Sequence, residues 1–179
     1  MKHLLAGFLI LISLFTNGQT GISNDTLHWS SSRMLTWADF KGEPIEGIGL
    51  IGEAFCMNLA NFEKPNMFNK TNFKVIALFD KTKSWINEKN KTEIVLRYFQ
   101  VMFNIYEVHA RSLRRDLSTT KFGADPNPVF QEKYNQSMTN LMNEFNQFRK
   151  ETKMGLDVNS LDSWKIKVDK ALKNLENYR

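Results

Sequence analysis

The residues whose types best suit acid–base or metal chemistry are His28, His109 and Glu107. Imidazole titrates near neutral pH and, together with carboxylates, binds zinc in many enzymes. His109 combined with Glu107 or His28 could therefore form a metal or acid–base site. The alternative, which we favour, is that His109 is a partly buried histidine hydrogen-bonded to a neighbour. Glu107 and Arg111, four residues apart in a helical pattern, are expected to form an ion pair.

The remaining residues match no other catalytic motif. The sequence contains no G-x-S-x-G, P-loop or dinucleotide-binding pattern. Its acidic residues are scattered, without a pair that suits glycoside hydrolysis. The single cysteine, Cys56, cannot form an intramolecular disulfide, and the sequence shows no partner that would activate its thiol. Cys56 lies in an apolar run, which predicts a small buried hydrophobic side chain.

Glu107 and His109 belong to a long helical pattern that runs from Glu93 to Arg114. Its apolar residues cover more than half of the helix circumference, which predicts a largely buried helix. Zinc peptidases commonly carry an H-E-x-x-H motif on such a helix. The two histidines, one turn apart, face one metal ion, the glutamate activates a zinc-bound water, and a third ligand comes from elsewhere in the chain.

Segments on both sides of this helix share a pattern with known proteins. They are Trp29, Arg33, residues 35–44 (Leu-Thr-Trp-Ala-Asp-Phe-Lys-Gly-Glu-Pro), residues 79–85 (Phe-Asp-Lys-Thr-Lys-Ser-Trp), residues 151–155 (Glu-Thr-Lys-Met-Gly) and Trp164. Through these segments the chain resembles a family of secreted zinc-dependent proteases (domain of unknown function 922). The active helix of that family reads H-E-Q-x-H-F-D-I-x-E-x-x-A-R-x-L-R. The helix positions that match are Gln100, Phe103, Ile105, Glu107, Ala110, Arg111, Leu113 and Arg114. The resemblance covers almost the whole chain after residue 19.

The departures from the family pattern fall on the residues that would bind zinc. Tyr98 and Met102 stand where the family has its two histidines, and Phe99 replaces the glutamate. Met154 replaces the histidine implied as the third ligand, and Asn104 replaces an aspartate. Thioethers are soft, weak ligands, and a tyrosine must lose a proton with a pKa near 10 before it binds as an anion. The resemblance implies zinc for the family, but for this chain we expect no metal or other cofactor.

The order of the predicted elements indicates an α+β fold, because strands come first and helices follow. The elements are a short strand, a turn and a second extended piece within 27–44, strands at 47–63 and 73–80, and helices at 93–114, 129–150 and 160–176. We expect a short antiparallel sheet from the N-terminal half, packed on two long helices plus a C-terminal helix. The resemblance implies that this arrangement is zincin-like.

The first residues have the features of an export signal. A short basic start precedes an apolar run at residues 4–15, and small and polar residues follow it. The run is too short to span a bilayer comfortably, although an uncleaved N-terminal anchor is the alternative. We therefore predict a signal peptide at residues 1–19 and a single domain at residues 20–179. No cysteine lies near the cleavage region, so a lipoprotein anchor is not expected. The mature protein would be periplasmic or secreted, in a bacterium, without an integral membrane segment.

The charge of the chain argues against nucleic acid as a partner. The formal net charge is +5, but acidic residues are interspersed with the basic ones, whereas nucleic-acid binders concentrate basic residues in a stripe. A diffuse positive charge fits weak association with anionic envelope surfaces better.

The sequence thus predicts an exported, catalytically inactive relative of zinc metallopeptidases. Its role would be to bind a partner protein, a peptide held without cleavage, or a component of the cell envelope. One alternative is a metallopeptidase or other hydrolase with a relocated site around His109 and Glu107, and another is a structural envelope protein. The space between Tyr98, Met102 and Met154 bears most directly on these alternatives.

Overall fold

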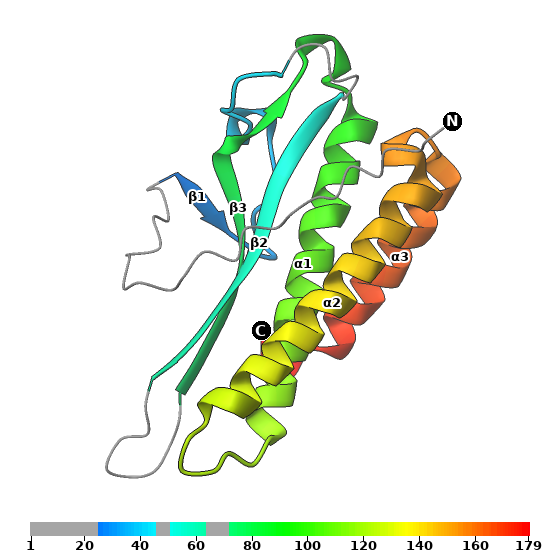
Figure 1. Ribbon diagram of the computed structural model, residues 1–179. Helices are drawn as coiled ribbons and strands as arrows, with labels where there is room; N and C mark the ends of the chain where they lie inside the picture. Colours follow the sequence, from blue (N-terminus) through cyan, green and yellow to red (C-terminus); the bar gives the residue numbers. More distant parts are fainter. Residues whose placement is uncertain (1–24, 46–50, 64–71) are drawn as a thin grey trace, which may run out of the picture.

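A computed structural model of the protein describes residues 25–45, 51–63 and 72–179, so the predicted signal peptide lies outside the described residues. Three antiparallel strands in the order β1-β3-β2 lie on one side of α1, and α2 and α3 lie on the other (Figure 1). The bounds are β1 Thr26–His28, β2 Gly52–Glu63, β3 Asn72–Ile86, α1 Glu93–Thr119, α2 Asn127–Thr152 and α3 Val158–Asn174. The prediction of an α+β fold is confirmed.

Of the two main strands, β3 is longer than predicted, whereas residues 47–50 of the strand predicted at 47–63 lie outside the described residues. The strand predicted to end at Asp80 continues to Ile86, because the side chain of Ser84 bridges a register shift in the pairing with β2. Its hydroxyl accepts a hydrogen bond from the Phe55 amide at 2.9 Å and donates to the Asp80 carbonyl at 2.6 Å. A polar side chain thus replaces the missing ladder bonds at this bulge.

The segment between β1 and β2 differs from the prediction. The short strand is confirmed by β1, but a 3-10 helix at Trp37–Asp39 stands where a second extended piece was predicted. The Asp39 carboxylate accepts hydrogen bonds from the Thr36 amide at 2.9 Å and from Arg33 Nη2 at 2.7 Å. A carboxylate that satisfies backbone amides in this way stabilises a turn over an extended chain.

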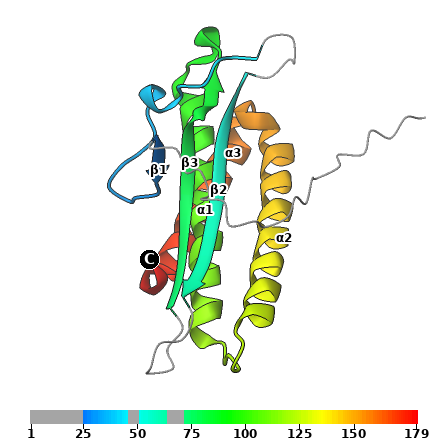
Figure 2. The same ribbon diagram turned by 60° about the vertical axis from the view of Figure 1, so that its left-hand side comes forward.

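Helix α1 is the central element, since the sheet, α2 and α3 all pack on it (Figure 2). Thr92 caps its first turn by accepting a hydrogen bond from the Val95 amide. Residues on several faces of α1 are almost completely buried, among them Val101, Ile105 and Leu113, as the apolar periodicity predicts. Within the part of the chain that the structure describes, no helix is both long and apolar enough to cross a membrane.

Three consecutive residues with positive φ form the turn between α2 and α3. They are Lys153 (φ 49°), Met154 (φ 57°) and Gly155 (φ 91°). The turn ends α2 near the predicted position, and a Cβ added at Gly155 would lie 3.0 Å from Cβ of Tyr98. The turn therefore packs tightly against α1 and positions Met154 beside it.

Substitution of Gly155 with alanine should destabilise the protein. The positive φ and the contact with Tyr98 each disfavour a β-carbon, so we expect a loss of about 1–3 kcal/mol in the free energy of unfolding. Urea denaturation of purified protein measures this loss. Gly123→Ala is the matched control, because a Cβ at Gly123 meets no atom within 4 Å. Equal stabilities of the two variants would contradict the prediction.

Candidate functional site

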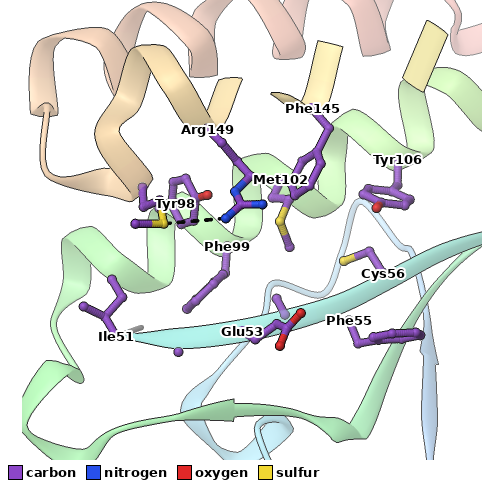
Figure 3. A pocket seen from close by; sticks show the side chains of 13 residues that line it. Ile51, Glu53, Phe55, Cys56, Tyr98, Phe99, Met102, Tyr106, Phe145 and Arg149 are labelled. Carbon is purple, nitrogen blue, oxygen red and sulfur yellow. Dashed lines mark hydrogen bonds between the residues drawn. The ribbon is translucent and has the colours of Figure 1, made fainter. Parts of the chain in front are cut away.

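Four of the five positions that depart from the pattern of the resembled family, all except Asn104, line a single cavity. Helical spacing places Tyr98, Phe99 and Met102 along one face of α1, and the turn after α2 adds Met154 from much later in the sequence. The cavity has a volume of about 200 Å³. Figure 3 shows Tyr98, Phe99 and Met102 on α1 facing the space between β2 and α2.

The cavity is part of a cleft with α1 as its floor and with β2 and α2 as its walls. Phe145 and Arg149 extend from α2, and residues 51–56 line the opposite wall (Figure 3). Further along, the walls meet, since the rings of Phe62 and Phe130 lie 4.9 Å apart. Six consecutive residues of one wall line the cavity, whereas a strand that faced it with one side would contribute alternate residues. The cleft therefore borders the edge of the sheet.

The backbone of β2 has outward-facing groups along this edge. The Phe55 amide points toward β3, where it donates to Ser84 Oγ. Since backbone groups of successive strand residues point in opposite directions, those of Ala54, Cys56 and Asn58 point away from β3. The Asn58 carbonyl is accordingly reached from α2 by the Tyr134 hydroxyl at 3.4 Å. No strand of the described residues pairs with this edge, so within that part of the chain the outward backbone groups of Ala54 and Cys56 have no strand partner.

The interior of the cavity is apolar and carries little charge. Burial raises the pKa of the Tyr98 hydroxyl to about 12, with Arg149 acting in the opposite direction, and burial also raises the pKa of the Cys56 thiol. Both side chains are therefore protonated at neutral pH and are poor nucleophiles. Cys56 is half-buried, whereas the sequence predicted a buried side chain.

Two charged side chains lie at the mouth of the cavity. Glu53 and Arg149 are both exposed. Arg149 Nη2 donates to Met154 Sδ at 3.8 Å, and its guanidinium lies 5.5 Å from the ring centroid of Phe145. In the described part of the chain Arg149 forms no ion pair with a carboxylate, so it can bind an anionic group of a ligand.

The residues of the alternative, relocated site are His28, Glu107 and His109. They lie outside the cleft and have separate partners. His109 Nε2 lies 2.8 Å from Glu144 Oε2, and Glu107 accepts hydrogen bonds from Arg111 Nε at 2.9 Å and from Arg114 Nη1 at 3.0 Å. The predicted pair of Glu107 and Arg111 is confirmed. His28 is exposed on β1, opposite Leu78 of β3. None of the three lines the cleft, and over residues 25–45, 51–63 and 72–179 no group of three or more His, Cys, Asp or Glu could hold a metal ion.

Residues that match the family pattern hold other segments on α1. Gln100 accepts a hydrogen bond from the Leu35 amide at 2.7 Å and donates to Asn104 Oδ1 at 2.9 Å. The indole of Trp29 donates to the same Asn104 oxygen at 2.8 Å. These contacts attach the segment after β1 to α1, on the side away from the cleft.

The pair of Glu144 and His109 should make stability depend on pH. The hydrogen bond from His109 lowers the pKa of Glu144 to about 2, against the effect of burial, and Lys167 lowers it further. A carboxyl whose pKa falls on folding stabilises the protein above its unfolded pKa, here 4.5, and loses that contribution as the pH drops toward 2.

Glu144→Gln should therefore lower the free energy of unfolding by about 1–2 kcal/mol at pH 7. The difference from the wild type should shrink steadily as the pH falls below 4.5. Urea denaturation at several pH values between about 3 and 7 measures it. A difference that stays constant over this range would show that the charge of Glu144 does not contribute.

Several cleft residues were not anticipated from the sequence. Tyr106 continues the spacing of Tyr98 and Met102 by one more turn, so periodicity could have indicated it. Phe145 and Arg149 are also four residues apart, on the next predicted helix. Nothing in the sequence relates them to β2, because only packing brings α2 opposite that strand.

Comparisons with models of protein families, with curated proteins and with solved structures found no match to this chain.

Proposed function

We propose that this chain is an exported, non-catalytic, zincin-like relative of zinc-dependent proteases that binds an extended peptide in the cleft between β2 and α2. The observation that carries the proposal is that Tyr98, Phe99, Met102 and Met154 line one cavity. The positions of two helix ligands, a general base and a third ligand must meet in this way in a zinc peptidase. Their replacement by uncharged side chains leaves a binding surface.

The substituted side chains suit a stable site without metal. Tyr98 stacks on Phe148 with centroids 4.9 Å apart and an interplanar angle of 11°, and Phe99 lies 5.1 Å from Phe40. Clustered polar ligands without a metal would be costly to bury, whereas these rings add apolar contacts. The cavity of about 200 Å³ that remains has room for an apolar side chain of a ligand.

The free edge of β2 supports an extended peptide rather than a folded partner. A peptide that adds to a sheet edge gains main-chain hydrogen bonds, and pockets for its side chains give specificity. Here the outward backbone groups of Ala54 and Cys56 would provide the hydrogen bonds, and the cavity would accept an apolar side chain. Arg149 at the mouth favours an acidic group next to that side chain.

A displayed library of short random peptides, selected on purified residues 20–179, tests the proposal. Selected peptides should share a large apolar residue near an acidic one. Met102→Trp fills the cavity and should abolish their binding, while Met142→Trp, at an exposed position of α2 outside the cleft, should leave it unchanged. Failure to select any sequence class, or equal effects of the two variants, would overturn the proposal.

Proline substitutions test the use of the strand edge. Ala54→Pro removes an outward amide that the sheet does not use, so it should weaken peptide binding with little loss of stability. Ala60→Pro removes an outward amide of the same edge beyond the residues that line the cavity and is the matched control. Stoichiometric zinc in the purified protein, lost together with hydrolytic activity in His109→Ala, would instead establish a relocated catalytic site.

A further inference from the structure

A second, larger cavity lies across α1 from the cleft. It has a volume of about 710 Å³ and is bounded by the segment after β1, by α1, by α3 and by the residues that follow α3. Figure 2 shows the segment after β1 and the C-terminal residues on the same side of β3, and Arg179 Nη2 donates to Ser31 Oγ across the gap. We call this cavity the α1–α3 groove. Its size falls in the range of small-molecule sites, about 300–1,000 Å³.

The middle of the α1–α3 groove is apolar. Trp29, Leu35, Leu96, Val101 and Leu172 line it. Leu35 and Val101 are buried, and the other three pack against the core with part of their surface exposed. These side chains offer a continuous surface for a hydrocarbon chain or ring, because they come from three elements that meet over α1.

The end of the groove nearest Trp29 is positively charged. Arg111 is 3% exposed and lies over the Trp29 ring, 5.0 Å from its centroid. Its Nε donates to Glu107 and its Nη1 donates to the Leu172 carbonyl at 2.7 Å, while Nη2 makes no hydrogen bond among the described residues. Lys173 is exposed and pairs with no carboxylate in the same part of the chain.

The charges along the groove are unequally distributed. Around Arg111 the lining also includes Lys173, Arg179 and the acidic Glu176, while Glu107, which pairs with Arg111, is not part of the lining. At the far end Lys165 pairs with Asp169 at 2.6 Å, and Arg97 pairs with Asp162 at 3.1 Å. The most favourable position for the anionic group of a ligand is therefore near Arg111. The apolar part of the same ligand would extend toward Leu96.

We propose that the α1–α3 groove binds an anionic amphiphile, a small molecule with a hydrocarbon body and a terminal carboxylate. The carboxylate would lie among Arg111, Lys173 and Arg179, where Nη2 of Arg111 and the ammonium group of Lys173 can donate charge-assisted hydrogen bonds to it. The hydrocarbon body would cover Trp29, Leu35 and Leu96. This site is separate from the peptide cleft and does not depend on its function.

Decanoate, titrated into ¹⁵N-labelled protein and followed by NMR, is the test. The indole of Trp29 donates to Asn104 Oδ1 inside the groove, so its signal should shift and saturate. The indole of Trp164 donates to Glu151 away from the groove and should not shift. Uncharged 1-decanol should bind more weakly than decanoate, because it lacks the charge that the basic end attracts.

Variants assign the binding to the groove. Lys173→Glu should weaken decanoate binding about fivefold to tenfold, whereas Lys170→Glu, the same change on α3 outside the groove, should have no effect. Leu96→Trp should block binding, and Met102→Trp, which fills the peptide cleft, should not. The proposal is overturned if the Trp29 signal does not shift, if both lysine variants weaken binding equally, or if Met102→Trp abolishes it.

Discussion

Replacement of Glu107 with alanine is expected to lower the free energy of unfolding by about 3–5 kcal/mol. Glu107 is 3% exposed and accepts hydrogen bonds from Arg111 and Arg114. Without it, the buried guanidinium of Arg111 and the partly buried guanidinium of Arg114 would have no counter-charge. Removal of one partner of a buried pair is far more harmful than loss of an exposed pair.

The cluster of Glu107, Arg111 and Arg114 also connects distant parts of the fold, and this adds to the expected loss of stability. Arg111 donates to the Leu172 carbonyl, and Arg114 donates to the carbonyls of Val75 at 2.9 Å and of Tyr178 at 2.8 Å. Glu107 thus orients two arginines that attach β3 and the end of the chain to α1.

Asp162→Ala is the control for Glu107→Ala. Asp162 pairs with Arg97 at 3.1 Å, and both side chains are substantially exposed, at 50% and 35%. Its loss should therefore change stability by at most about 1 kcal/mol. Urea denaturation of both variants provides the measurement. Similar small losses in both would show that Glu107 is not a structural anchor and would leave it available for chemistry.

Histidine substitutions in the cleft should create a zinc site. Tyr98 and Met102 lie one turn apart on α1, and Met154 lines the same cavity. Three histidines at these positions should bind one zinc ion, because two imidazoles at this spacing face one ion and the turn supplies the third. Phe99 stays unchanged in this variant, since a glutamate at this buried position would add an unpaired charge.

A second triple variant is the control for zinc binding. It carries histidine at Tyr98 and Met102 but has its third histidine at Met142, which is 46% exposed on α2 and outside the cavity. Competition with a chromogenic chelator measures the zinc affinity of both variants. The control should bind zinc at least about tenfold more weakly than the first variant, which is a difference of about 1.4 kcal/mol in binding free energy. Zinc should also raise the melting temperature of the first variant more than that of the control. Equal affinities would show that residue 154 is not placed to complete a metal site.

Local sequence patterns predicted most of the helical part of the fold. Apolar periodicity identified α1, and it also identified the helix that ends near Gly155. It missed the last turns of α1 beyond Arg114, where apolar residues become sparse. Periodicity also ended the third strand at Asp80, because the polar run from Lys81 to Ser84 resembles a loop. Pairing with β2 keeps that run in the sheet, and such pairing is a long-range property that no local window contains.

The sequence by itself determined which residues differ from a zinc peptidase motif. The types of Tyr98, Phe99, Met102 and Met154 are sufficient to see that a zinc peptidase motif would be without its ligands. The charge pair of Glu107 and Arg111 also followed from a spacing of four residues.

Only the tertiary structure decided what surrounds these positions. The cleft depends on the separation between α2 and the free edge of β2, and the α1–α3 groove depends on three segments that meet on the other side of α1. Periodicity reports which face of a helix is apolar, but not which element covers that face or leaves it open. Buried charges, strand edges and cavities arise from contacts between residues far apart in the chain, and for this reason both proposed binding sites became visible only in the folded molecule.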